Sequence, residues 1–190
     1  MALPRGLYGI VDLLADEDLA AAIDRGRFLV DNGVQAVQLR AKLAPVERVF
    51  ALVEGLAPFV PVLIVNDHAL VAAQIGAWAH LGQEDGPGVS IPFGRSTHTL
   101  EQAKNATDAT YIGFGPVFQT STKATGYSPR GPALLREAVR CSPVPVVAIG
   151  GITADNIDEV RASGAHAWAP ISGLWSLRND ALALRQLLAL

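Results

Sequence analysis

Residues 144–172 read VPVVAIGGITADNIDEVRASGAHAWAPIS and contain a complete strand–helix–strand unit. The Val- and Ile-rich run at 144–150 ends in a glycine pair, which predicts a buried strand followed by a turn. A helix is expected at 154–163, where Thr153 can cap its start and Gly164 can end it. An apolar run at 167–172 predicts the next strand, and strands joined through a helix pair in parallel.

The same alternation extends over the rest of the chain. Further strands are expected at 7–12, 36–40, 62–66, 77–82, 93–96 and 111–115. Further helices are expected at 18–32, 45–56, 69–75, 100–105, 132–140 and 181–190. About eight such repeats are typical of a closed barrel, with an open doubly wound sheet as the alternative. We therefore predict an α/β fold, a single (β/α)8 TIM barrel over residues 1–190, in which the Gly/Pro-rich crossover 83–92 holds no helix.

The composition is that of one globular domain. The chain has 190 residues, of which 50% are hydrophobic and 17% are charged, so it can bury a sizeable core. A net charge of −3 argues against a broad nucleic-acid surface. No apolar run reaches the roughly 20 residues that span a bilayer, and no signal-peptide pattern is present, so we expect a cytoplasmic protein without a membrane partner. The oligomeric state stays open, with a homo-oligomer among the alternatives.

Polar side chains gather at the expected carboxyl ends of the strands, where ligands bind in this fold. Three of them are the cations Arg40, Lys42 and Lys123, and the hydroxyl groups of Thr120 and Thr122 lie just before Lys123. Arg can bind a phosphate group bidentately and Lys supplies a point charge, so this set favours a polyphosphate ligand. Taken alone, Arg40 and Lys42 would more simply form surface ion pairs.

Two carboxylates at the same edge favour a metal ion. Asp67 follows one strand and Asp85 follows the next. Carboxylates beside a pyrophosphate commonly hold Mg²⁺, so we expect magnesium here, although Asp67 can also cap the following helix. Gly151 and Ser172 open the turns after the last two strands, the usual place of a phosphate-monoester site in this fold. The residues therefore suggest two anion sites, one of them assisted by a metal.

Together these residues resemble the thiamine phosphate synthase family, and the resemblance runs from Tyr8 to Ser172. The matching segments, in order, are Gln38-x-Arg40-x-Lys42, Asn66-Asp67, His80-x-Gly82-Gln83-x-Asp85, Gly94-x-Ser96-x-His98, GPVFQTSTK at 115–123, IGGI at 149–152 and Ile171-Ser172. Any one of these segments is weak evidence. GPVFxTxTK together with QxRxK and ND is highly specific.

The resemblance implies a transferase of thiamine biosynthesis that acts on two small molecules. Its expected reaction condenses 4-amino-2-methyl-5-hydroxymethylpyrimidine diphosphate with thiazole phosphate, giving thiamine phosphate and pyrophosphate through a dissociative, carbocation-like step. The residues that it implies for the pyrimidine diphosphate are Gln38, Arg40, Lys42, Asn66, Ser96 and Lys123, with Arg40, Lys42 and Lys123 as the catalytic cations. Those implied for the thiazole phosphate are Thr120, Thr122, Gly151, Ile171 and Ser172, and those for Mg²⁺ are Asp67 and Asp85.

Two other functions stay open on the same scaffold. The thiazole tautomerase paralogues share the segment 95–98, but they have a histidine where this chain has Pro116, which cannot transfer a proton. The second alternative is a regulatory protein that binds thiazole phosphate without turnover.

His98 can serve as a general base, although packing near the next helix is the favoured interpretation. Ala41 stands where the family has an acid, so we expect a slowed synthase that Ala41→Glu improves.

Overall fold

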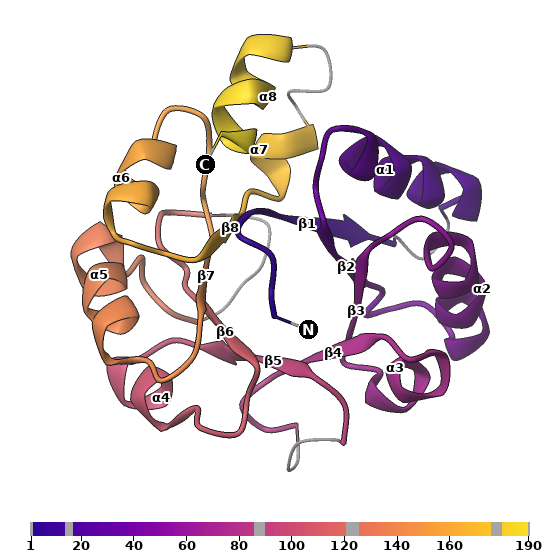
Figure 1. Ribbon diagram of the computed structural model, residues 1–190, viewed down its shortest axis with the longest axis horizontal. Helices are drawn as coiled ribbons and strands as arrows, with labels where there is room; N and C mark the ends of the chain where they lie inside the picture. The colour runs from indigo at the N-terminus through magenta and orange to yellow at the C-terminus, as the bar shows by residue number, and fades with distance from the viewer. Residues whose placement is uncertain (1, 14–16, 86–89, 121–125, 176–179, 190) are drawn as a thin grey trace.

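The computed structural model describes residues 2–13, 17–85, 90–120, 126–175 and 180–189, and within them a parallel sheet closes into a barrel (Figure 1). Its strands pair in sequence order from β1 to β8, and β8 returns to β1 through Gly6 opposite Ala167. The strands are β1 (Gly6–Asp12), β2 (Ala36–Arg40), β3 (Val62–Asn66), β4 (Trp78–Leu81), β5 (Phe93–Thr97), β6 (Tyr111–Phe114), β7 (Val146–Ile149) and β8 (Ala167–Ala169). The (β/α)8 prediction is confirmed, and the open sheet is excluded.

The helices form an outer ring around the strands (Figure 1). They are α1 (Leu19–Asp31), α2 (Val46–Leu56), α3 (Ala69–Ile75), α4 (Leu100–Asn105), α5 (Gly131–Cys141), α6 (Ile157–Ala162), α7 (Ser172–Trp175) and α8 (Ala181–Leu188). The short α7 has no counterpart among the expected helix ranges, although Ser172, where it starts, was expected to open a turn. Residues 82–85 and 90–92 form no helix, in agreement with the expectation for that crossover. No helix in the described ranges is long and apolar enough to cross a membrane.

One helix start differs from the prediction by more than one residue. We expected Thr153 to cap a helix from residue 154, whereas α6 begins at Ile157. Asn156 accepts a hydrogen bond from the Thr153 N–H through its side-chain oxygen, and its amide group donates to the carbonyl oxygen of Gly151. These side-chain bonds hold residues 153–156 in a turn, because they offer the backbone an alternative to helical hydrogen bonds.

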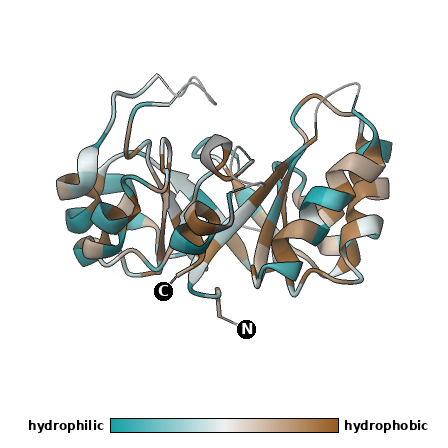
Figure 2. Cartoon of the chain, turned by 90° about the horizontal axis from the view of Figure 1, so that it is seen from above, coloured by the Kyte–Doolittle hydropathy of each residue, from teal (hydrophilic) through white to brown (hydrophobic). Residues whose placement is uncertain are grey.

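Two apolar layers hold the barrel together, because successive side chains of a strand point to opposite faces. On β3, Val62 and Ile64 belong to the cluster inside the barrel, and Leu63 and Val65 belong to the cluster between strands and helices. Figure 2 shows the strands in hydrophobic colour between helices that carry hydrophilic colour. The barrel interior is therefore a packed core rather than a pore.

The N-terminal segment closes one end of the barrel. Leu3 is buried in the inner cluster, and its carbonyl oxygen lies 2.8 Å from Nε2 of His166. The Gly6 N–H donates to the carbonyl oxygen of His166. Because this end holds the start of β1, the carboxyl ends of the strands lie at the opposite end, which is left for a ligand.

Candidate active site

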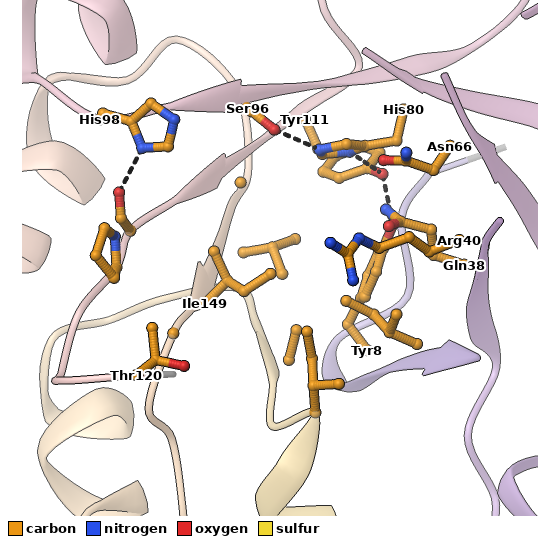
Figure 3. A pocket seen from close by; sticks show the side chains of 18 residues that line it. Tyr8, Gln38, Arg40, Asn66, His80, Ser96, His98, Tyr111, Thr120 and Ile149 are labelled. Atoms are coloured by element: carbon orange, nitrogen blue, oxygen red, sulfur yellow. Dashed lines mark hydrogen bonds between the residues drawn. The ribbon is translucent and has the colours of Figure 1, made fainter. Parts of the chain in front are cut away.

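A cavity of about 800 Å³, its open mouth included, lies at the carboxyl ends of the strands (Figure 3). Its walls combine aliphatic side chains with a few polar groups from different strands. The lining residues are Tyr8, Ile10, Gln38, Arg40, Asn66, His80, Ser96, His98, Tyr111, Gly113, Gly115, Pro116, Thr120, Val147, Ile149, Gly150, Ala169 and Ile171.

Polar side chains, most of them buried, form a continuous hydrogen-bonded chain in the cavity floor (Figure 3). Nε2 of Gln38 donates to the Tyr8 hydroxyl at 2.8 Å, which lies 2.7 Å from the Tyr111 hydroxyl. The Tyr111 hydroxyl lies 2.9 Å from Nδ1 of His80. Nε2 of His80 lies 3.0 Å from Oγ of Ser96. The chain joins β1, β2, β4, β5 and β6 across the barrel.

Both phenols in this chain remain protonated at neutral pH. Burial is the largest cause, because it disfavours the charged phenolate, and it raises the pKa of Tyr8 and that of Tyr111 well above the usual value. The negative charge of an ionised Tyr8 would raise the pKa of Tyr111 further. Each hydroxyl is therefore a hydrogen-bond donor as well as an acceptor.

The Tyr111 ring fits in the barrel because the neighbouring strand has a glycine opposite it. Gly94 pairs with Tyr111 in the β5–β6 register. A Cβ atom at residue 94 would lie 2.0 Å from Cζ of Tyr111, closer than real Cβ contacts come. The missing side chain of Gly94 thus makes room for the ring.

Arg40 and Lys42 each face a carboxylate near the mouth. Nη1 of Arg40 lies 2.7 Å from Oδ1 of Asp12, which stands opposite it in the β1–β2 register. Nζ of Lys42 lies 3.6 Å from Oδ2 of Asp67. Asp67 has a φ of 63°, in the left-handed region that non-glycine residues rarely adopt. Such backbone strain is often found at functional sites.

Asn66 offers a buried donor that none of the described residues uses. The residue is 7% exposed, and its Nδ2 has no hydrogen-bond partner in the part of the chain that the structure describes. Buried polar groups almost always have a partner. A ligand oxygen in the cavity is a suitable acceptor for this amide.

Asp85 does not line the cavity. Its carboxylate accepts a hydrogen bond from the Gly82 N–H, and it borders a surface groove together with Arg95 and Glu101. The described residues hold no group of three or more His, Cys, Asp or Glu side chains suited to a metal ion. Magnesium, however, is often held by one or two carboxylates with substrate phosphates and water completing its shell. Asp67 and Asp85 supply oxygen donors of this kind, and they follow two paired strands, β3 and β4.

The opposite wall of the cavity is built by the turn after β7. Gly150 lines the cavity, and Gly151 has a φ of 65°. A Cβ atom at Gly151 would lie 2.4 Å from the carbonyl oxygen of Gln119, so the segment before Thr120 packs directly on this glycine. Thr120 and Ile171 line the same wall.

The structure brings together most of the expected site residues. Gln38, Arg40, Asn66, Ser96, Thr120 and Ile171 line the cavity. Asp67 and Gly151 are next to lining residues in the sequence, and Lys42 is two residues after Arg40. Thr122 and Lys123 lie outside the described residues. Ser172 is the first residue of α7, and its side chain is also outside the description.

Sequence reasoning missed the aromatic floor of the site. Tyr8 and Tyr111 were read only as parts of strands, and His80 only as part of a motif. A signal was available, because Tyr8 alternates with Ile10 along β1, and Gln38 alternates with Ala36 along β2, on the faces that point into the barrel. A polar atom at an inward strand position needs a partner, which points to a buried network.

His98 is held at the edge of the cavity. Its Nδ1 lies 2.6 Å from the carbonyl oxygen of Gly115, and its ring stacks on Tyr127 at a centroid distance of 4.4 Å. Its backbone N–H donates to Oε1 of Gln102 in α4. These contacts agree with packing beside the next helix, the interpretation that the sequence favoured.

Ala41 lies away from the cavity. It is 1% exposed and belongs to the apolar cluster between strands and helices. A glutamate at this position would place its carboxylate among hydrophobic side chains. This burial argues against the expectation that Ala41→Glu improves the enzyme.

Comparison with known proteins points to one family. A family model described as thiamine monophosphate synthase matches residues 7–174. The thiamine-phosphate synthase of Anaeromyxobacter dehalogenans is 37% identical, over 89% of this chain and 80% of that protein. The thiamine-phosphate synthase of Chlorobium luteolum is 34% identical, over 95% of this chain and 92% of that protein.

Solved structures agree with the sequence comparison. A thiamine phosphate pyrophosphorylase from Pyrococcus furiosus superposes with a TM-score of 0.80 at 29% identity, covering 96% of this chain and 93% of that one. A tryptophan synthase α-subunit from the same organism has a TM-score of 0.68 at 13% identity, over 97% of this chain and 96% of that one. The second likeness shows the barrel fold alone.

Proposed function

Because the chain belongs to the thiamine monophosphate synthase family, we propose that it condenses a pyrimidine diphosphate with thiazole phosphate to give thiamine phosphate and pyrophosphate. The observation that carries the proposal is the arrangement of the cavity. Donors from β2, β3 and β5 line one wall, and the glycine turn after β7 lines the other. Aliphatic side chains lie between them. Two phosphorylated heterocycles can therefore be held with their phosphates apart and their rings in contact.

The diphosphate end supplies charge and hydrogen bonds for the leaving group. Arg40 binds a phosphoryl oxygen, Asn66 donates its unused N–H, and Ser96 donates its hydroxyl. Asp12 orients the Arg40 guanidinium through their ion pair. A dissociative reaction needs this stabilisation of departing charge more than it needs a nucleophilic side chain.

Mg²⁺ would be held by Asp67 and Asp85, and it would neutralise charge on the diphosphate. Lys42 lies beside Asp67 and forms an ion pair with its carboxylate. We assign Thr122 and Lys123 to the same reaction on the family resemblance, Lys123 to the departing pyrophosphate and Thr122 to the thiazole phosphate.

The thiazole phosphate end is built from backbone and small side chains. Gly151 is required there by its φ and by the close approach of Gln119. Thr120 offers a hydroxyl group in the wall, and α7 starts at Ser172 beside Ile171. Backbone N–H groups at such a turn suit a phosphate monoester.

The direct test is synthesis from purified components. The protein is mixed with both substrates and Mg²⁺, and thiamine phosphate and pyrophosphate are measured by mass spectrometry, with each substrate omitted in turn. Arg40→Ala should lose most of the activity, whereas Arg140→Ala, at an exposed position of α5, should keep it. Binding of thiazole phosphate without product points to the regulatory alternative. Isomerisation of the thiazole carboxylate phosphate without condensation points to the tautomerase.

A second test concerns the metal. Activity should disappear in a chelator and return when Mg²⁺ is added in excess. Asp67→Asn should lower turnover strongly, whereas Asp31→Asn at the exposed end of α1 should not. Full activity in the chelator would contradict the magnesium assignment.

Two further points of the proposal concern the setting of the enzyme. Its phosphorylated substrates are charged and do not cross membranes freely, which supports action in the cytoplasm. A homo-oligomer remains a prediction, and light scattering coupled to size-exclusion chromatography measures it.

A further inference from the structure

The hydrogen bonds in the cavity floor all donate in one direction along the row of side chains. Gln38, at the start of the row, sets that direction. The Gln38 NH₂ group is donor-only, and it donates to the Tyr8 hydroxyl oxygen. The Tyr8 proton therefore points to the other neighbour of that oxygen, the Tyr111 hydroxyl at 2.7 Å. Both phenols keep their protons, because burial raises the pKa of each.

Donation continues in the same direction from the two tyrosine hydroxyls to the His80 imidazole. The Tyr111 oxygen accepts from Tyr8, so its own proton points to Nδ1 of His80 at 2.9 Å. A neutral imidazole with an accepting Nδ1 carries its proton on Nε2. That N–H faces Oγ of Ser96 at 3.0 Å.

The opposite direction is disfavoured by the same contacts. If Ser96 donated to His80, then His80 would donate to Tyr111 and Tyr111 to Tyr8. The Tyr8 proton would then lack an acceptor, because among the described residues its hydroxyl bonds only Gln38 and Tyr111. A buried donor without a partner is costly, so the first direction prevails.

We propose that this row of hydrogen bonds holds His80 in its Nε2–H form and turns the Ser96 hydroxyl proton into the cavity. Ser96 then donates to a phosphoryl oxygen of the substrate. Tyr8, Tyr111 and His80 are thus positioning residues that act through Ser96. The inference rests on the proposed function, which supplies the anionic ligand, and it deepens that function. With the opposite direction, Ser96 would present lone pairs to the anion and repel it.

The hydrogen-bonded residues orient the Ser96 hydroxyl proton and do not transfer a proton among themselves. Passing a proton from Tyr111 to His80 would leave a buried phenolate, which burial strongly disfavours. Replacing Tyr111 should therefore change the strength of diphosphate binding and departure. It should not abolish an acid or base step.

The first test observes the histidine directly, in the intact protein and without substrate. The chain has four histidines, so ¹⁵N-histidine labelling gives a simple spectrum, and His80→Asn assigns the signal. We expect the ring nitrogen shifts of an Nε2–H imidazole. In Tyr111→Phe, which keeps the ring packed on Gly94, we expect the two neutral forms to mix. An Nδ1–H imidazole in the wild type, or an unchanged spectrum in Tyr111→Phe, would overturn the inference.

The second test asks whether Tyr111 acts through Ser96. Tyr111→Phe should lower kcat/KM for the pyrimidine diphosphate about 10- to 100-fold, as the loss of a group that orients a metal ligand does at metal sites. KM for thiazole phosphate should stay unchanged. In a Ser96→Ala background, the same substitution should have little further effect. In a Ser142→Ala background, whose serine lies at the end of α5, the full effect should remain. Equal losses in all three backgrounds would mean that Tyr111 only supports packing.

Tyr8→Phe provides an independent variant if Tyr111→Phe folds poorly, which thermal unfolding followed by circular dichroism shows. It removes one step of the chain and leaves the Tyr111 hydroxyl beside His80. We expect a smaller loss that again disappears in the Ser96→Ala background, and an additive loss would contradict the inference. A wild type that makes no thiamine phosphate would contradict the proposed function instead, whereas the nuclear magnetic resonance result would still stand.

Discussion

Gly94→Ala should destabilise the barrel through a clash with one aromatic ring. The added Cβ would lie 2.0 Å from Cζ of Tyr111 and 2.4 and 2.5 Å from its two Cε atoms. Reaching an ordinary contact of about 3.4 Å would require the ring to move by more than 1 Å in a close-packed interior. The ring cannot move freely, because its hydroxyl is bonded to Tyr8 and to His80.

The magnitude follows from two terms. Overpacking of a core typically costs about 1–3 kcal/mol. Weakening the two hydrogen bonds of the Tyr111 hydroxyl adds about 1 kcal/mol each. Alanine is favoured over glycine within a strand by about 0.5–1 kcal/mol, which offsets part of the loss. We therefore expect the free energy of unfolding to fall by about 2–4 kcal/mol, and Tm by about 4–16 °C for a chain of this length.

The assay is urea unfolding followed by circular dichroism and fluorescence. Gly113→Ala is the matched control, because Gly113 lies on the adjacent strand, and a Cβ there would meet Cε1 of His80 at 3.4 Å, an ordinary contact. We expect that control to change stability by less than about 1 kcal/mol. Wild-type stability in Gly94→Ala, or equal losses in the two variants, would refute the reasoning.

Three further predictions follow from the site and its surroundings. Asp12→Asn should raise KM for the pyrimidine diphosphate or lower kcat by about 10-fold, because Arg40 loses its ionic partner, and steady-state kinetics with unchanged KM for thiazole phosphate would check this. Ala41→Glu should lower the free energy of unfolding by about 2 kcal/mol or more, because its carboxylate would be buried among apolar groups, and a variant as stable as the wild type would contradict this. Tyr8 and Tyr111 have pKa values raised above the usual 10.0, so the unfolded chain releases these protons at a lower pH than the folded protein does. The free energy of unfolding should therefore fall as pH rises above about 10, by about 1.4 kcal/mol per pH unit for each tyrosine. Urea unfolding at several alkaline pH values measures this slope, and Tyr8→Phe should make it shallower.

Local sequence signals determined much of the fold. The bounds expected for α3 and α4 agree with the structure, because each helix carries its own stop or start signal. Gly76 ends α3 in the left-handed conformation, and Thr99 with Gln102 forms a capping box at the start of α4. The predicted start of α6 was wrong, because the side chain of Asn156 forms hydrogen bonds with the backbone of the turn before the helix.

The position of the site was also determined by the sequence. Parallel strands of a barrel all end on the same face, so residues at strand ends meet whatever their separation in the chain. Gln38 and Arg40 are alternate residues of β2, and Asn66 and Ser96 lie at or near the ends of β3 and β5. All four line one cavity.

Only the tertiary structure decided the partners within that cavity. Tyr8 and Tyr111 are 103 residues apart, on β1 and β6, and they meet because the barrel closes and Gly94 leaves room for a ring. The pairing of Asp12 with Arg40 depends on the register of β1 against β2. The burial of Ala41 depends on how the chain leaves β2 toward the outer layer. Sequence patterns give each strand its two faces, whereas register, closure and side-chain volume across the barrel fix which atoms touch, because these depend on all the strands at once.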